Sequence, residues 1–315
     1  MFLKRSTAYG AVFKRKRVLQ NVLLAAILIA LLSLLPAVYF RLREQGSNER
    51  RDLRDSFEYG DFETAYIQSA DMLKEKPLDS FLLTIRGFSA YQLAIAQINS
   101  FDTQRYVDDC IWSLRKALLF RENSQDGRIF YVLGKAYFYK GLGYADLAIT
   151  YLEKAQEVLY RAADIPEYLG LAYASIRDFR SSVAAFALAL TGEGPFGTEP
   201  SDVLLLSIAK SYLALDEAES AKAYLVRCLE ISRDSMTIVA ARLLLGGVLV
   251  KIGDTSGAEA EYLKVIEENG ENAEARYLLG ELYASEGDAT RARAEWRRAV
   301  RIDPAYGPAR GRLNL

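Results

Sequence analysis

The sequence predicts an all-α fold in which helix pairs stack into an elongated array, preceded by one membrane-spanning helix. Three observations predict it. The composition is ample for a buried core, with 51% hydrophobic and 26% charged residues, and it favours helix over sheet, because alanine and leucine are abundant and only seven of the 315 residues are proline. A stretch of 23 residues near the N-terminus, residues 18–40, carries no charge. After it, small and large side chains recur at intervals of 34 to 47 residues.

Residues 1–17 are predicted to form a basic cytoplasmic tail, with six lysine or arginine residues and no acidic residue. The remaining 298 residues carry a net charge of −7. Since nucleic-acid-binding proteins normally present a clustered basic surface, we expect no nucleic-acid partner. The block Lys14–Arg17 is interpreted as a membrane-topology signal, with a patch for lipid headgroups as the alternative.

Residues 18–40 are predicted to form a transmembrane signal-anchor helix. A helix needs about 20 apolar residues to cross the hydrocarbon core. Twelve of residues 22–40 are Leu, Ile, Val or Phe, which together favour insertion by roughly 4 to 7 kcal/mol. A cleaved signal peptide is the alternative. Its apolar region usually has about 7–15 residues before a small-residue cleavage site, whereas this run is longer and ends in Tyr39-Phe40.

The orientation of this helix is predicted from the charges around it. Five arginines lie within residues 41–55, so the basic-residue counts on the two sides are nearly equal. Moving a tail of charge +6 out of the cytoplasm works against the membrane potential and costs about 2.3 kcal/mol per charge per 100 mV. We therefore expect a cytoplasmic N-terminus and a periplasmic body. The absence of Asn-x-Ser/Thr sequons favours the inner membrane of a bacterium.

Residues 80–306 carry the internal repeat, which is clearest in residues 273–306. There, small residues occupy positions 8, 20 and 27 (Gly280, Ala292 and Ala299), large ones occupy positions 11 and 24 (Tyr283 and Trp296), and Pro304 comes at position 32. Earlier units begin at Val239, Asp202, Ala163, Gly127, Ser80 and Gly46. This pattern resembles the tetratricopeptide repeat family. The resemblance implies a right-handed superhelical solenoid of about seven helix–turn–helix units.

Helix packing explains why such a pattern recurs. Small residues at positions 8, 20 and 27 let two antiparallel helices approach, and large residues at positions 4, 7, 11 and 24 fill the remaining space. The turn between the helices favours a left-handed glycine followed by an acidic helix start. Three units supply this pair: Gly60-Asp61, Gly253-Asp254 and Gly287-Asp288.

Four segments depart from the repeat. Residues 41–79 are predicted to be a linker and a degenerate first unit, whose polar opening helix serves as an end-cap. The second unit has about 11 extra residues, which we expect to lengthen its helices, because its apolar residues keep helical spacing. Residues 191–201 are rich in Gly and Pro and predict an exposed loop. Residues 307–315 are expected to be a C-terminal tail too short for a complete capping helix.

The residue types argue against catalysis. The chain has no histidine, which removes the commonest general base and metal ligand. Cys110 and Cys228 fall at positions for small packed side chains and are expected to be buried and unpaired. We therefore predict a protein that is not an enzyme and binds no cofactor or metal. An enzyme or a nucleotide-binding regulator is the least favoured alternative.

The resemblance also implies a groove lined by the first helix of each unit, at positions 2, 5, 9, 12 and 13. The residues expected to form this partner-binding groove are Phe81, Phe88, Tyr91, Tyr131, Lys135, Phe138, Tyr139, Glu167, Leu171, Leu206, Lys210, Leu213, Val250, Tyr277 and Glu281. The N-terminal half of this set is rich in aromatic residues, which are good anchors for a partner helix or extended segment. The competing interpretation is that the chain's own neighbouring helix covers them.

The sequence thus predicts a membrane-tethered scaffold that docks a segment of another envelope protein. A secretion-linked chaperone assembly and the scaffold of a flagellar motor are both compatible settings. Tethering makes even a weak groove useful, because it raises the effective concentration of a partner on the same membrane. The alternative is an organelle import or assembly receptor that faces the cytosol, which requires the opposite membrane topology.

Overall fold

The computed structural model describes residues 47–96, 100–191 and 200–314. The expected basic tail and the expected transmembrane helix, 18–40, lie outside these ranges. Within them the regular structure is helical, with α-helices and a single 3-10 turn at Leu142–Tyr144. No helix among the described residues has the length and apolar character needed to cross a membrane.

The helices form seven consecutive pairs, which we call units, each with an A helix followed by a B helix. The A helices are 47–58, α3 (Ser80–Ala96), α5 (Gly127–Lys140), α7 (Ile165–Ser175), α9 (Asp202–Ala214), α11 (Ser235–Lys251) and α13 (Ala273–Ser285). The B helices are α2 (Phe62–Glu75), α4 (Ser100–Ala117), α6 (Ala145–Glu157), α8 (Phe179–Leu190), α10 (Ala218–Ile231), α12 (Thr255–Glu268) and α14 (Ala289–Ile302).

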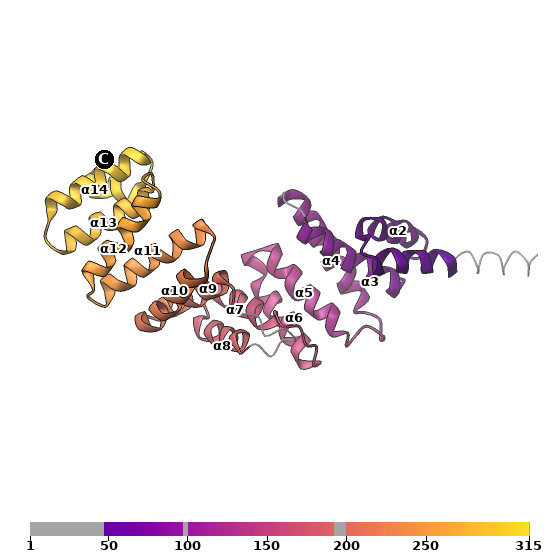
Figure 1. Ribbon diagram of the computed structural model, residues 1–315. Coiled ribbons are helices and arrows are strands. Elements are labelled where there is room, and N and C mark those ends of the chain that lie inside the picture. The colour runs from indigo at the N-terminus through magenta and orange to yellow at the C-terminus, as the bar shows by residue number, and fades with distance from the viewer. Residues whose placement is uncertain (1–46, 97–99, 192–199, 315) are drawn as a thin grey trace, which may run out of the picture.

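The pairs stack in chain order. From α2 onward each helix packs against the next one along the chain, and the first A helix contacts α2 through the rings of Phe57 and Phe62. Figure 1 shows the resulting elongated, bent array, in which α2 lies near one end and the C-terminus lies at the other. The predicted all-helical repeat solenoid is therefore confirmed. The predicted unit starts match the A helices to within a few residues, and the largest difference is at Val239, because α11 begins at Ser235.

Close approach of the paired helices depends on the small residue at position 8. A Cβ added at Gly280 would lie 2.6 Å from the Trp296 ring, and one added at Gly134 would lie 2.5 Å from Leu152. The large partner stands at repeat position 24 in both units. Since real carbon atoms do not approach so closely, only glycine fits at these two positions without a shift of the neighbouring side chain. The packing predicted from the repeat is present.

The turns between the helices follow the predicted chemistry in some units and not in others. Gly60, Gly253 and Gly287 all have positive φ, between 82° and 85°. The aspartate after each accepts a hydrogen bond from an amide in the first turn of the B helix. Two other units reach the same backbone conformation without glycine, with φ of 66° at Arg177 and 69° at Asp216.

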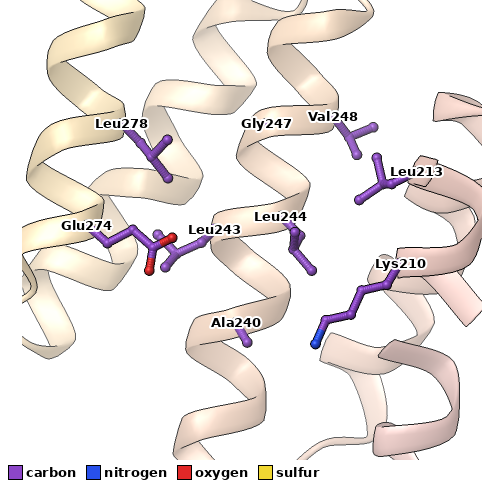
Figure 2. A pocket seen from close by; sticks show the side chains of 9 residues that line it. All are labelled: Lys210, Leu213, Ala240, Leu243, Leu244, Gly247, Val248, Glu274 and Leu278. Carbon is purple, nitrogen blue, oxygen red and sulfur yellow. The ribbon is translucent and has the colours of Figure 1, made fainter. Parts of the chain in front are cut away.

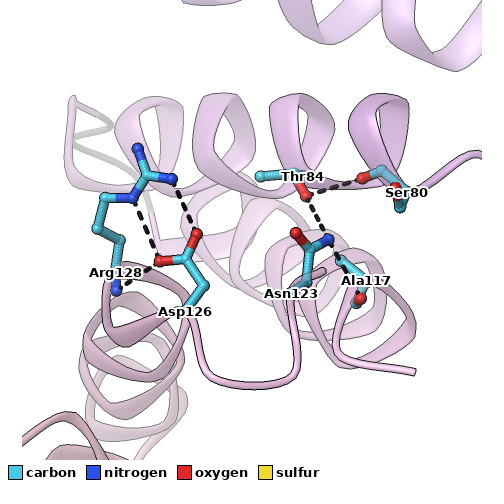
Figure 3. A network of polar contacts seen from close by, with 6 residues as sticks. All are labelled: Ser80, Thr84, Ala117, Asn123, Asp126 and Arg128. Atoms are coloured by element: carbon cyan, nitrogen blue, oxygen red, sulfur yellow. Dashed lines mark hydrogen bonds and ion pairs between the residues drawn. The ribbon is translucent and has the colours of Figure 1, made fainter. Parts of the chain in front are cut away.

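The second unit is the longest of the array, as expected from its extra residues. Its helices α3 and α4 have 17 and 18 residues. The connection from α4 to α5 is fixed by polar contacts (Figure 3). Asn123 donates to the carbonyl of Ala117 at 3.2 Å and to the hydroxyl of Thr84 at 3.3 Å, and Asp126 caps α5 by accepting from the Arg128 amide at 2.9 Å.

The C-terminal segment differs from the expected tail. Gly307–Leu313 form a seven-residue helix, α15, that packs against α14 and buries Ala309. Proline in its first turn favours helix initiation, since its fixed φ is already helical and it has no amide hydrogen to leave unbonded. This short helix covers the open side of the last unit. Most of the expected loop 191–201 lies outside the described residues.

The buried side chains form two large clusters and a small one between them. One large cluster runs from Leu53 to Ala185 and the other from Leu205 to Ala309. The small cluster is formed by Phe186, Leu204 and Ile208, where the fourth unit meets the fifth. The core is therefore continuous only between neighbouring units, as in other repeat arrays.

Candidate partner-binding groove

A hollow of about 430 Å³ lies between three successive A helices of the C-terminal half. Its walls and floor are formed by residues of α9, α11 and α13, namely Lys210, Leu213, Ala240, Leu243, Leu244, Gly247, Val248, Glu274 and Leu278. The B helices do not contribute. Its volume falls within the roughly 300–1,000 Å³ of ligand sites.

The hollow has an apolar floor between two opposite charges. Figure 2 shows Lys210 reaching in from α9 and Glu274 from α13, on opposite sides of the apolar residues of α11. Both side chains are exposed, and neither forms an ion pair or a hydrogen bond within the described part of the chain. These charges are therefore available to a bound molecule.

Glycine opens the floor of the hollow at Gly247. A Cβ added there would have only the Tyr262 hydroxyl nearby, at 4.0 Å, whereas one added at the adjacent Gly246 would overlap the Tyr262 ring. Gly246 is thus needed for the packing of α11 on α12. Gly247, in contrast, leaves free space above the α11 backbone.

The aromatic residues predicted from α3 are covered by the chain itself. The Phe81 ring lies under the guanidinium groups of Arg50 and Arg54, at 5.6 and 5.5 Å from the ring centroid. The Phe88 ring stacks on Phe57, with centroids 6.4 Å apart, and Tyr91 is only 6% exposed. The helix over residues 47–58 supplies all three covering residues. These contacts are of the kind that the competing interpretation describes, although Phe81 and Phe88 are half-buried and only Tyr91 is buried.

Lys135 and Tyr131 belong to a partly buried polar network, in which Lys135 is buried and Tyr131 and Asp164 are half-buried. The Lys135 ammonium donates to the Asp164 carboxylate at 2.7 Å and to the Tyr131 hydroxyl at 3.0 Å, and Tyr131 donates to Asp164 at 2.8 Å. Burial opposes the charge on Lys135, but these hydrogen bonds outweigh it and raise the pKa of the ammonium. A buried cation with its partners in place has little capacity to bind another molecule.

Phe138 and Tyr139 gather with residues of α7 beside that network. The Tyr139 hydroxyl lies 2.9 Å from that of Tyr168, and the Phe138 ring packs edge-on against Tyr168. Burial, followed by the hydrogen bond to Tyr168, raises the pKa of Tyr139 to about 12. Burial, followed by the charge of Asp164, raises the pKa of Glu167. Tyr139 is the most exposed of this cluster, at 37%.

The remaining predicted residues divide between the hollow and covered positions. Lys210 and Leu213 line the hollow, whereas Leu206 is buried, Leu171 packs into the small cluster and Val250 is exposed outside it. In α13, Tyr277 packs against the Tyr306 ring with centroids 5.8 Å apart, and Glu281 accepts a hydrogen bond from Arg312 of α15 at 2.9 Å. The C-terminal segment therefore covers both of these residues.

Seven residues of the hollow were not predicted. They are Ala240, Leu243, Leu244, Gly247, Val248, Glu274 and Leu278. Four of them stand at the same repeat positions that were used for the prediction, positions 2, 5 and 9 of the unit at Val239 and position 2 of the next. Three of these four residues, Ala240, Leu243 and Gly247, are of types that are common in helix cores, so residue type alone does not mark them as groove residues. The sequence feature that could have indicated the hollow is the glycine at position 9 of the unit at Val239, because the other units carry larger side chains at this position.

The two cysteines are structural. Both are fully buried and unpaired, as expected, and burial raises the pKa of each thiol. Cys228 also lies 3.3 Å from the carbonyl oxygen of Asp202. In the described ranges, no group of cysteine, aspartate and glutamate side chains lies close enough together to hold a metal ion.

Tetratricopeptide repeats are found in the chain by two family models. One matches residues 243–306, and the other matches residues 128–158 and 204–235. These matches fall in units 3, 5, 6 and 7. The chain therefore contains tetratricopeptide repeats within a helical solenoid, and proteins with such repeats generally bind other proteins.

Solved structures of similar shape include tetratricopeptide-repeat proteins. The C-terminal part of a repeat-containing protein from Cytophaga hutchinsonii has a TM-score of 0.60 at 18% identity, over 84% of this chain and all of that one. PilW, a type IV pilus biogenesis factor, has a TM-score of 0.56 at 18% identity, over 72% and 98% of the two chains. YrrB, a repeat protein with an unusual peptide-binding site, has a TM-score of 0.51 at 21% identity, over 64% and 98%. No curated protein matches the sequence.

Proposed function

We propose that this chain is a membrane-tethered scaffold that docks a segment of a partner protein in the hollow between α9, α11 and α13. The observation that carries the proposal is an apolar floor set between unpaired Lys210 and Glu274. An apolar side chain of the partner would fill the floor. An acidic residue on the α9 side and a basic residue on the α13 side would pair with the two charges.

The hollow suits this role better than the aromatic residues of the N-terminal half. Those rings already pack against the chain's own side chains, so a partner would have to displace existing contacts to reach them. The hollow offers apolar surface without a competing internal partner. Side chains buried in such pockets near the centre of an interface contribute most of its binding free energy.

Photo-crosslinking in the native membrane tests the groove. A photo-reactive residue at Leu244, on the floor of the hollow, is compared with one at Leu263, which is exposed on α12 away from the hollow. We expect a protein to be captured from position 244 and not from position 263. Gly247→Leu fills the hollow and should reduce this capture at least tenfold. Equal capture from both positions, or capture that survives Gly247→Leu, would contradict the proposal.

The tether is proposed to be the helix over residues 18–40, with the N-terminus in the cytoplasm and the repeats in the periplasm. The support is the uncharged apolar stretch together with the +6 charge of residues 1–17. A reporter enzyme that is active only outside the cytoplasm, fused to the C-terminus, tests the orientation. Activity is expected. A reporter that works only in the cytosol would favour the import-receptor alternative instead.

We further propose that the chain acts by binding alone and is not an enzyme. The chain has no histidine to serve as a general base. Among the described residues the most buried cation, Lys135, is held by Asp164 and Tyr131. Assays of the purified full chain for nucleotide binding and hydrolysis are expected to be negative, and reproducible turnover would contradict this part of the proposal.

A further inference from the structure

The C-terminal end of the array is strongly basic, whereas the rest of the body is acidic. Residues 289–315 contain seven arginines and two acidic residues, a net charge of +5. Residues 18–288 contain 27 basic and 39 acidic residues, a net charge of −12. No lysine occurs after Lys264, so every cation of this end is a guanidinium. Terminal repeats need a polar outer face for solubility. Solubility alone does not explain why this face is mostly positive, or why all of its positive side chains are arginine.

Three of these arginines form a stripe along α14. Arg293, Arg297 and Arg301 are spaced four residues apart, which places successive side chains about 6 Å apart along one face of the helix. All three are exposed, while the opposite face of α14 buries Ala292, Trp296 and other residues against α13. The stripe therefore faces away from the solenoid core.

The stripe has no partner within the described chain. The other arginines of α14 do have partners: Arg291 donates to Asp288 at 2.6 Å, and Arg298 is paired with Glu295. The side chains of Arg293, Arg297 and Arg301 make no hydrogen bond, ion pair or ring contact with any residue that the structure describes. A three-residue row of unpaired guanidinium groups therefore presents fifteen N–H donors to the surroundings.

The surroundings of the stripe select among anionic ligands. Single-stranded nucleic acids are usually held by aromatic stacking as well as by charge, and membrane-surface helices insert large apolar side chains. Among described residues after Leu263, no large hydrophobic side chain is exposed. The neighbouring acidic body would also repel an extended polyanion. A short row of carboxylates at the same 6 Å spacing matches the stripe, as on a helix with acidic residues at every fourth position.

We propose that Arg293, Arg297 and Arg301 form a second docking surface, which binds an acidic helical segment of a partner protein. Each guanidinium can bind a carboxylate with two parallel hydrogen bonds, which a lysine cannot do. This surface lies on a B helix, whereas the hollow is lined by A helices alone. The two surfaces can therefore be occupied and tested independently.

The test measures binding of a labelled 20-residue helical peptide with glutamate at every fourth position to the full chain in a neutral detergent. A peptide with glutamine at those positions is the ligand control. Arg293→Gln/Arg297→Gln/Arg301→Gln is expected to weaken binding of the acidic peptide at least tenfold in 50 mM salt. The matched control removes three exposed arginines elsewhere, Arg161→Gln/Arg180→Gln/Arg227→Gln, and should weaken it less than twofold. Arginine-to-lysine changes at the stripe should give an intermediate loss.

Several outcomes would overturn the assignment. Equal weakening by the two triple variants would mean that net charge alone drives binding. The same variants are tested with a 20-nucleotide single-stranded DNA and with phosphatidylglycerol vesicles. If either binds more tightly than the peptide and depends on the stripe, the ligand of the stripe would be a nucleic acid or a membrane and not an acidic segment. Loss of peptide binding in Gly247→Leu would place the peptide in the hollow. The arginine positions are exposed, so both triple variants should keep the wild-type helicity and melting temperature.

Discussion

Gly246 and Gly247 are adjacent in α11 but are surrounded differently. A methyl group at position 246 would overlap the Tyr262 ring, whereas one at position 247 meets only a hydroxyl at 4.0 Å. Gly247→Ala should therefore stabilise the chain by up to about 1 kcal/mol, because alanine is the better helix former. Gly246→Ala should destabilise it by about 1–3 kcal/mol through overpacking. Urea unfolding followed by circular dichroism measures both, and equal effects would contradict the assigned roles.

Tyr262, which packs beside Gly246, makes the free energy of unfolding depend on pH. Burial raises the pKa of Tyr262 to about 12, and the side chain is only 2% exposed. The unfolded tyrosine loses its proton near its ordinary pKa of about 10, so the folded state binds more protons between these values. The contribution of the buried, protonated Tyr262 to the free energy of unfolding is therefore complete below about pH 10 and is lost as the pH rises through about 12.

Tyr262→Phe tests this linkage, since phenylalanine keeps the ring and removes the ionisable group. Between pH 9 and pH 12 the variant should lose less stability than the wild type, by up to about 3 kcal/mol. Tyr59→Phe is the control, because that ring is 89% exposed. Thermal melts across this pH range measure both variants, and parallel pH profiles for Tyr262→Phe and the wild type would refute the expected role of burial.

At the scale of an element, the turn between the paired helices requires a left-handed residue at repeat position 15. Arg177 fills this position in the fourth unit with φ of 66°, where other units use glycine. A left-handed backbone costs a residue with a Cβ about 1–2 kcal/mol. Arg177→Gly should therefore raise the melting temperature, because glycine adopts this backbone without that cost.

The matched control for this turn is Arg227→Gly in α10. Arg227 is also an exposed arginine, but it lies inside a helix. Glycine there should lower the stability by about 1 kcal/mol. Calorimetry of the two variants gives shifts of opposite sign if the backbone conformation decides the effect. Shifts of the same sign would mean that loss of the arginine side chain dominates.

The helix pairs could be predicted because the repeat encodes packing locally. Gly280 and Trp296 are 16 residues apart, and their contact follows from their spacing alone. The groove was less predictable, because it depends on which surfaces the chain covers by itself. Phe81 is of a residue type that often anchors a partner. The arginines that cover it lie in the degenerate first unit, where the repeat pattern is weakest. The hollow at Gly247 is defined by absent side chains, which composition does not reveal.

At the scale of the whole molecule, stability is distributed between two blocks. Among the described residues, the two large buried clusters are joined by the small cluster of Phe186, Leu204 and Ile208, together with partly buried neighbours such as Leu190 and the buried Ser182–Ser211 hydrogen bond. In repeat arrays, cooperativity passes from one interface to the next. This interface therefore decides whether the array unfolds as one body or as two. The hollow lies entirely in the C-terminal block, so partner binding there should stabilise that block first.

Ile208→Ala should uncouple the two blocks. The side chain is 1% exposed, so its truncation should cost about 2–5 kcal/mol at the interface that joins them. Hydrogen exchange by mass spectrometry in increasing urea should then show peptides from residues 80–190 and from residues 202–314 becoming unprotected at different urea concentrations. Leu82→Ala, at a fully buried position inside the N-terminal block, is the control and should lower the protection of that block alone. A single transition shared by all peptides of Ile208→Ala would mean that the small cluster does not limit cooperativity.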